Sequence, residues 1–228
     1  MKILAIETCT EACSAALMAD QHLEARFEIA PREHSKLVIG MVEELLVESG
    51  LLLGQLDAIA FGCGPGSFTG VRIGTGVAQG LAIGADLPVV PVSTLAALAQ
   101  QAYEKTGNKA LCAAIDARMG EIYWGCYHIE GADSLAVART KQYVSKPEDL
   151  ILSDNETWFG VGSGWDAYGK SCSSMVDLEI AYLASVYPSA SEVAKLASED
   201  FAQGKAVRAE DALPVYLRDN VASPKKPG

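Results

Sequence analysis

The chain has 228 residues, of which 50% are apolar and 21% are charged. A composition of this kind belongs to a globular protein with a sizeable core and excludes general disorder. The formal net charge of -11 argues against a nucleic-acid-binding surface, because such surfaces need clustered Lys and Arg. Any role that involves a nucleic acid is therefore expected to be indirect.

The N-terminal segment MKILAIETC has a short apolar run that ends at the acidic residue Glu7. Signal peptides and membrane spans both need a longer apolar stretch, so the sequence predicts a cytoplasmic protein without membrane association. The six cysteines are scattered, mostly within apolar runs, and no two of them form a CxxC motif. We expect them to be reduced thiols in or near the core.

The first half of the chain has the pattern of a mixed sheet with helices on its faces. Strands are predicted at residues 2–8, 12–19, 22–29, 57–62 and 88–92, and helices at residues 35–49, 69–84 and 94–105. Three consecutive strands followed by alternating helices and strands predict a five-stranded sheet. This order is the one found in each half of the ribonuclease-H-like and actin-like folds.

A weak internal repeat relates LAIETCTEACSAAL, residues 4–17, to AAIDARMGEIYWGCY, residues 113–127. Each copy is an apolar strand that ends in an acid, Glu7 or Asp116, and continues through a polar turn into another strand. Further elements are predicted as a strand near 134–144, a short helix opened by Pro147, a strand at 157–161, a loop at 160–169 and a helix at about 190–204. We therefore expect two lobes, residues 1–106 and 107–228, the second reduced and carrying the C-terminal helix.

The segment FGCGPGSFTGVRIGTGVAQGLA, residues 61–82, runs from a strand through a glycine-rich loop into a helix. Gly64 and Gly66 permit close backbone approach, and the amides at the helix start are suited to hold an anion. The loop does not end in GK[ST], so it is not a P-loop of the Walker type. A tight turn that only shapes the lobe surface is an equally good interpretation.

Four segments together resemble the TsaB (YeaZ) family, a subunit of bacterial threonylcarbamoyl transferase. They are ILAIETC, GPGSFTGVRIG, IDARMGEIYW and PVYLRD, and they lie between residues 3 and 219. The resemblance implies an actin-like ATPase fold (ASKHA, ribonuclease-H-like) and a non-catalytic subunit that pairs with its catalytic paralogue TsaD and with a TsaE-like ATPase. The reaction would transfer threonylcarbamoyl to the tRNA adenosine beside the anticodon, with ATP and a metal ion bound in the partner subunits and none by this chain alone.

The same resemblance indicates which catalytic features are missing. TsaD-like proteins carry an HxxxH metal pair after the fifth strand of the first lobe, where this chain has Thr94 and Leu98. Neither side chain can replace an imidazole nitrogen at about 2 Å from a metal. We therefore expect neither a metal site nor a catalytic residue.

A relic of a nucleotide site is expected at Glu7, Gly64, Gly66 and Asp116. Actin-like ATPases hold phosphates between two β-hairpins and use acids to bind hydrated magnesium, but the turn CTEAC after Glu7 lacks the expected glycines. Two enzymatic alternatives stay open. One is an actin-like ATPase or sugar kinase that uses Glu7 and Asp116, and the other, despite the missing HxxxH, is a metallo-glycopeptidase.

The first two helices are predicted to form a protein interface. Apolar residues of the first helix span an arc of about 200°, whereas a helix on a sheet needs roughly half of that. The second helix has glycines four residues apart, which allow close helix approach. The predicted interface residues are Leu37, Val38, Met41, Val42, Leu45, Gly70, Ile73, Gly74 and Val77. We expect this surface to form a homodimer when the chain is alone and a heterodimer with the TsaD-like paralogue, unless the two helices only pack on each other.

Overall fold

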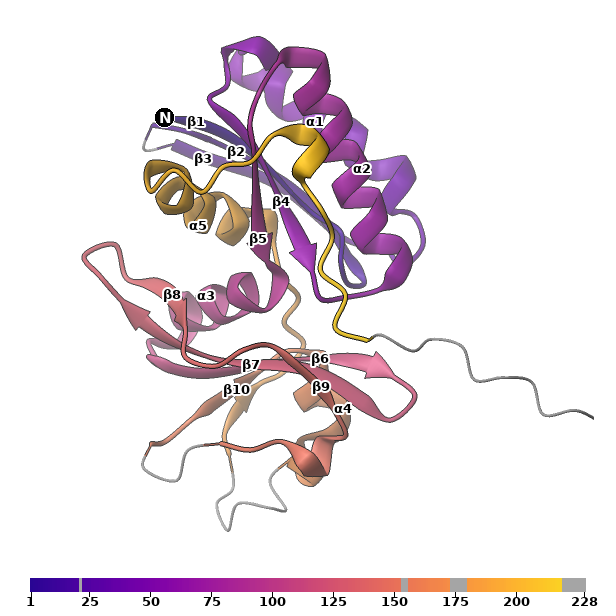
Figure 1. The fold of residues 1–228 in the computed structure, drawn as a ribbon, viewed down its shortest axis with the longest axis vertical. Coiled ribbons are helices and arrows are strands. Elements are labelled where there is room, and N and C mark those ends of the chain that lie inside the picture. The colour runs from indigo at the N-terminus through magenta and orange to yellow at the C-terminus, as the bar shows by residue number, and fades with distance from the viewer. Residues whose placement is uncertain (21, 153–155, 173–179, 219–228) are drawn as a thin grey trace, which may run out of the picture.

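The computed structural model describes residues 1–20, 22–152, 156–172 and 180–218. Two lobes lie one above the other, and each is built on its own β-sheet (Figure 1). The first sheet has five strands in the order β3-β2-β1-β4-β5, and the second has six strands. Within the described ranges, no helix is long and apolar enough to cross a membrane.

The first sheet is centred on β1 because the sequence KILAIE is apolar on both faces of the strand. Its strands are β1 (Lys2–Glu7), β2 (Ala12–Ala19), β3 (His22–Ile29), β4 (Ala58–Gly64) and β5 (Val89–Ser93). β1 pairs antiparallel with β2 and parallel with β4, and β4 pairs parallel with β5. The predicted five-stranded mixed sheet is confirmed.

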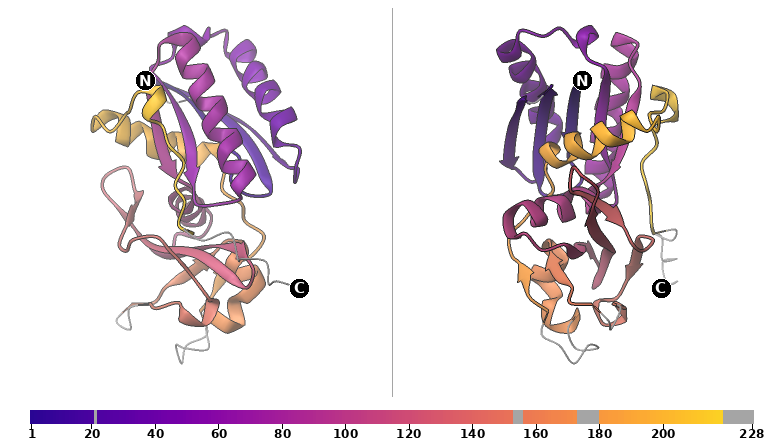
Figure 2. Two further views of the ribbon diagram at one scale, coloured as in Figure 1. Left: turned by 45° about the vertical axis from the view of Figure 1, so that its right-hand side comes forward. Right: turned by 90° about the vertical axis from the view of Figure 1, so that its left-hand side faces the viewer.

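Helices cover both faces of this sheet (Figure 2). The helices α1 (His34–Ser49) and α2 (Phe68–Ala85) pack on one face, and α5 (Ala190–Ala202) packs on the other. The prediction that placed the C-terminal helix in the second lobe is therefore wrong. The reason is that β1 has apolar side chains on both faces of the sheet. The helices α1 and α2 bury one face, and α5 buries the other.

The helix α3 (Thr94–Thr106) lies between the two sheets and covers the inner face of the second one (Figure 1). Its buried residues Leu95, Leu98 and Ala102 pack with Leu111 and Ile115 of that sheet. The predicted division at residues 106 and 107 therefore does not follow the packing. A helix from the first half of the chain belongs to the second core, and a helix from the second half belongs to the first.

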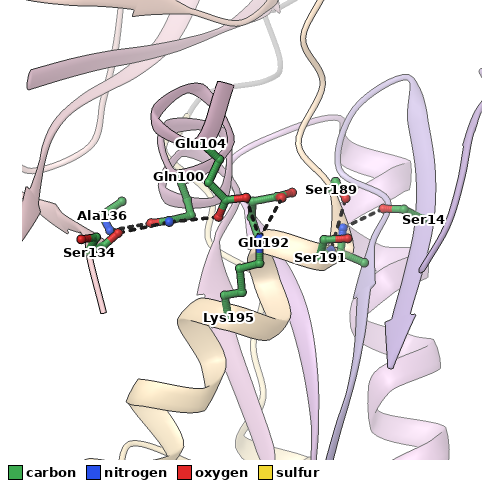
Figure 3. A network of polar contacts seen from close by, with 10 residues as sticks. Ser14, Gln100, Glu104, Ser134, Ala136, Ser189, Ser191, Glu192 and Lys195 are labelled. Carbon is green, nitrogen blue, oxygen red and sulfur yellow. Dashed lines mark hydrogen bonds and ion pairs between the residues drawn. The ribbon is translucent and has the colours of Figure 1, made fainter. Parts of the chain in front are cut away.

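A polar network joins α3, α5 and the segment 134–136 where the lobes meet (Figure 3). The Lys195 ammonium on α5 lies 2.6 Å from the Glu104 carboxylate on α3. The Gln100 side chain on α3 donates to the Ser134 carbonyl at 3.2 Å and accepts from the Ala136 amide at 2.8 Å. These bonds tie the lobes together beside the apolar contacts.

The second sheet has the order β11-β10-β6-β7-β8, with β9 also paired to β7. Its strands are β6 (Ala110–Arg118), β7 (Glu121–Glu130), β8 (Leu135–Ala138), β9 (Tyr143–Ser145), β10 (Phe159–Val161) and β11 (Tyr182–Leu183). The single strand predicted near 134–144 is split into β8 and β9, which pair with different parts of β7. The short helix opened by Pro147 is confirmed as a 3-10 turn at Pro147–Asp149.

The helix α4 (Ser163–Cys172) lies on the outer face of the second sheet, where a loop had been predicted. The prediction is wrong because the glycines there serve close packing rather than a loop. A Cβ at Gly164 would lie 2.9 Å from the Cβ of Ala114, so the helix sits directly on β6. Trp165 is fully buried and its indole donates to the Cys112 carbonyl at 2.8 Å, which anchors the helix.

All six cysteines are buried and unpaired, as predicted for core thiols. Burial raises the pKa of Cys13 and of Cys172 to about 11 and that of Cys63 to about 12. These thiols therefore stay protonated at neutral pH and behave as small apolar side chains.

Candidate functional site

A cavity of about 270 Å³ lies between the lobes, where four segments of the chain meet. The first lobe contributes the β1–β2 turn and the glycine-rich loop before α2, and the second lobe contributes the β6–β7 turn. The fourth wall is the segment 213–218, here called the C-terminal strap, which descends from the first lobe to the second (Figure 1). This cleft is where the sequence predicted a relic of a nucleotide site.

The glycine-rich loop is packed against the chain's own backbone. A Cβ at Gly66 would lie 2.3 Å from the Cys9 carbonyl oxygen, and the Ser67 amide donates to that same oxygen at 2.7 Å. Gly64 has a positive φ of 105°, and a Cβ there would lie 2.9 Å from the Val215 carbonyl oxygen. The two glycines thus allow the β1–β2 turn and the strap to approach, as expected for a tight structural turn.

Glu7 is buried at the end of β1 and does not line the cleft. Its carboxylate accepts from the Cys9 amide at 2.6 Å and from the Thr94 hydroxyl at 3.0 Å, and it lies against Gly62, where a Cβ would overlap it. Burial raises the pKa of Glu7, although the hydrogen bonds from Cys9 and Thr94 act in the opposite direction. Thr94, which stands where an imidazole would be needed, is therefore a structural partner of this acid.

Asp116 lines the cleft, but its carboxylate is already engaged. One oxygen accepts from the Arg118 amide at 2.9 Å and the other lies 3.1 Å from the Arg118 guanidinium. That guanidinium also lies 2.8 Å from the Glu11 carboxylate of the first lobe. Of the four predicted relic residues, the structure therefore brings Gly66 and Asp116 to one cleft and places Glu7 and Gly64 outside its lining.

Among the described residues, no group of three or more His, Cys, Asp and Glu side chains is placed to hold a metal ion. Thr94 and Leu98 are both buried on α3, and Leu98 contributes to the core of the second lobe.

The C-terminal strap is the feature of the site that residue patterns alone did not place. Its Val215 amide donates to the Cys63 carbonyl at 2.7 Å, which fastens it to the first lobe. Its Arg218 guanidinium pairs with Glu121 and reaches the Arg118 carbonyl, which fastens it to the second lobe. Residues 214–218 belong to the family motif PVYLRD, but nothing local in the sequence showed that they cross the cleft.

Six of the predicted interface residues are internal. Val38, Met41, Val42 and Leu45 are buried between α1 and the first sheet. A Cβ at Gly70 would lie 2.1 Å from the Thr8 carbonyl oxygen, and one at Gly74 would lie 2.7 Å from the Thr8 hydroxyl. The prediction that these six residues form a protein interface is therefore wrong, because they pack inside the first lobe. The apolar arc of α1 includes residues that face the sheet as well as residues that face outward.

The outward half of the same surface remains accessible. Leu37, Ile73 and Val77 are partly buried at its border. Ile39 on α1 is 40% exposed and Ile83 on α2 is 67% exposed. At three further glycines of α2, an added Cβ would have no atom within 4 Å. We call these residues the glycine row: Gly76, Gly80 and Gly84.

Two lobes with a β3-β2-β1-β4-β5 sheet, helices on both faces and a cleft between paired hairpins define a protein of the actin-like, ribonuclease-H-like class. Residues 27–226 match the family model for TsaD, tRNA N6-adenosine threonylcarbamoyltransferase. The chain is 46% identical to the tRNA threonylcarbamoyladenosine biosynthesis protein TsaB of Escherichia coli K12, with 100% of this chain and 99% of that protein covered. It belongs to the TsaB (YeaZ) family.

Two further comparisons agree with this assignment. The protein TsaB of Haemophilus influenzae is 41% identical over 100% of this chain and 98% of its own length. The solved structure of YeaZ from Pseudomonas aeruginosa superposes with a TM-score of 0.89 at 45% identity, covering 95% of this chain and 99% of that one. Both lobes are therefore shared with these relatives.

Proposed function

We propose that this chain is a non-catalytic subunit needed for threonylcarbamoyl transfer to the tRNA adenosine beside the anticodon. It binds a TsaD-like catalytic subunit and a TsaE-like ATPase in the cytoplasm, and it meets tRNA only through them. Support comes from the names of its relatives, which are tRNA threonylcarbamoyladenosine biosynthesis proteins. ATP and the metal ion of the reaction are held by the partner subunits.

The observation that carries the non-catalytic assignment is that the chain's own groups occupy part of the cleft and leave a small cavity. The strap crosses it, Asp116 is paired with Arg118, and Glu7 is buried behind its wall. The remaining cavity of about 270 Å³ falls below the roughly 300–1,000 Å³ of ordinary ligand pockets. An independent ATPase or kinase activity therefore has little room for a nucleotide.

The partner surface is proposed to be the outward face of α1 and α2, centred on the glycine row. Because no atom lies within 4 Å of an added Cβ at Gly76 or Gly80, a helix of the partner can approach the α2 backbone closely. Exposed Ile39 and Ile83 supply apolar area beside it. A second copy of this chain has the same face, so homodimer and heterodimer compete for one surface.

The proposal is tested with the purified chain and the threonylcarbamoyl transferase paralogue of the same bacterium. We expect a heterodimer by size-exclusion chromatography with light scattering, and no threonylcarbamoyl transfer by the chain alone. Gly80→Leu should fold normally, because its side chain enters open space, but should lose the heterodimer. Ala132→Leu, an exposed site in the second lobe, is the matched control. Transfer activity of the chain alone, or full capture by Gly80→Leu, would contradict the proposal.

A further inference from the structure

The guanidinium of Arg72 is held between two exposed aromatic rings at the start of α2. Its central carbon lies 3.2 Å from the centroid of the Phe68 ring and 4.8 Å from that of the Tyr216 ring. One of its nitrogens donates to the Phe68 carbonyl at 3.1 Å. Phe68 is 61% exposed and Tyr216 is 46% exposed, so this group, here called the aromatic clamp, is a surface feature.

Internal pairing does not explain the clamp. Among the described residues, no carboxylate forms an ion pair with Arg72. Five other arginines do pair with carboxylates, and they are Arg26, Arg118, Arg139, Arg208 and Arg218. The first turn of α2 contains no acidic residue, and a cation near a helix N-terminus is opposed by the helix dipole. Two rings and one carbonyl therefore hold the Arg72 guanidinium, and its charge remains available to an anion from outside.

The clamp continues the surface proposed above for the protein partner. Phe68, Arg72, Gly76 and Gly80 follow one another at four-residue intervals, so they lie along one side of α2. A partner helix on the glycine row would therefore have one end beside the guanidinium. The planar guanidinium binds a carboxylate through two parallel hydrogen bonds, and its stacking on fixed rings lowers the entropy lost when such a pair forms.

We infer that the aromatic clamp receives a carboxylate side chain of the transferase paralogue and makes Arg72 a specificity-determining residue of the heterodimer. This inference rests on the proposed function. A tRNA phosphate is the less suitable occupant, because nucleic-acid surfaces need clustered free cations and the neighbouring Arg118 and Arg218 are already paired. Exposed aromatic rings beside a single arginine have instead the composition of a protein interface hot spot.

The test compares the affinity of four full-length variants for the purified transferase by isothermal titration calorimetry at low and high salt. Arg72→Gln should weaken binding by about tenfold or more, as an interface hot spot does, and should reduce the salt dependence. Arg72→Lys should also lose affinity, because lysine keeps the charge but cannot form the two parallel hydrogen bonds of a guanidinium. Tyr216→Ala should cost about threefold through the loss of one ring. Arg139→Gln, which removes the same charge from the second lobe, should bind like the wild type.

Each outcome decides a separate question. If the wild-type chain binds the transferase and both Arg72→Gln and Arg139→Gln bind it within about twofold of the wild-type affinity, the inference about the clamp is wrong. The proposed function is then unaffected. If the wild-type chain does not bind the transferase, both the inference about the clamp and the proposed function are wrong. A fluorescence anisotropy measurement with tRNA and the chain alone provides the last arm. If Arg72→Gln weakens tRNA binding and leaves the transferase affinity unchanged, the clamp is a phosphate site and the inference is wrong.

Discussion

The Arg118 guanidinium of the second lobe lies 2.8 Å from the Glu11 carboxylate of the first lobe. This exposed pair joins the two lobes across the cleft, and the Arg218–Glu121 pair joins the strap to the second lobe. We expect Arg118→Ala to change the free energy of unfolding by no more than about 1 kcal/mol, because exposed ion pairs contribute little. Adding Arg218→Ala removes the pair of the strap with Glu121, so the double variant should release the strap from the second lobe.

The release can be measured by hydrogen exchange at the Val215 amide, which donates to the Cys63 carbonyl. Exchange should accelerate in the double variant and not in Arg139→Ala, whose ion pair lies within the second lobe. Unchanged protection in the double variant would show that the strap is held by its first-lobe contacts alone.

Glu7 is predicted to be a structural acid. Glu7→Ala leaves the Cys9 amide and the Thr94 hydroxyl without their acceptor and opens a cavity, so it should cost about 2–5 kcal/mol in urea unfolding. Glu7→Gln keeps the size and one acceptor oxygen, so it should fold and should still bind the transferase. Loss of transferase binding by a stably folded Glu7→Gln would instead support a functional role for the charge.

Glu192 on α5 is predicted to make the stability of the chain depend on pH. It is buried, and among the described residues one of its carboxylate oxygens has no hydrogen-bond partner. Burial raises the pKa of Glu192, nearby Lys195 opposes this shift and Glu104 adds to it (Figure 3). The folded state then binds its proton more tightly than the unfolded state. This contribution to stability is present below about pH 4.5 and is lost as pH rises through the raised pKa.

Glu192→Gln removes that titration. We expect the variant to be as stable as the wild type or more stable at neutral pH, and to lose part of the pH dependence as pH rises above about 4.5. Thermal unfolding across this range provides the measurement, with the exposed Glu43→Gln as control. A variant that is less stable than the wild type at pH 7 would mean that the pair with Lys195 outweighs the cost of burial.

Val38 and Ile39 are neighbours on α1 whose side chains point about 100° apart, one into the core and one toward the surface. Val38 is buried against the first sheet, so Val38→Glu places an unpaired charge in the core and should unfold the chain or cost several kcal/mol. Ile39→Glu should fold with a normal circular dichroism spectrum and weaken transferase capture. A folded Val38→Glu, or full capture by Ile39→Glu, would contradict this division of the helix.

The elements of the first lobe follow from the sequence because their patterns are local. The apolar run of β1 and the period of α1 and α2 are present within single segments, so their positions are predicted to within a few residues. The sheet on which α3 or α5 packs depends on which sheet face the other elements leave exposed. That exposure is decided by the whole chain and not by any single segment. For the same reason the sequence shows the wide apolar arc on α1 but not which half of it faces the sheet.

The candidate site shows the same division. Asp116 and Gly66 could be placed in the cleft from the hairpin repeat and the glycine-rich motif. The burial of Glu7 depends on Thr94, which lies 87 positions away in the chain. The clamp depends on Tyr216 returning to Phe68 from the far end of the sequence. Contacts of this kind leave no local pattern that a single sequence can reveal.

The return of α5 to the first sheet also bears on how the chain is made. Ile3 and Ala5 emerge from the ribosome nearly 200 residues before their cover on α5, which includes Val193 and Ala197. At roughly 5–20 residues per second, these side chains of β1 wait about 10–40 seconds for that cover. Until then, this face of the first sheet exposes an apolar surface of the kind that chaperones recognise. The first lobe is therefore translated first but is among the last parts of the molecule to complete its packing.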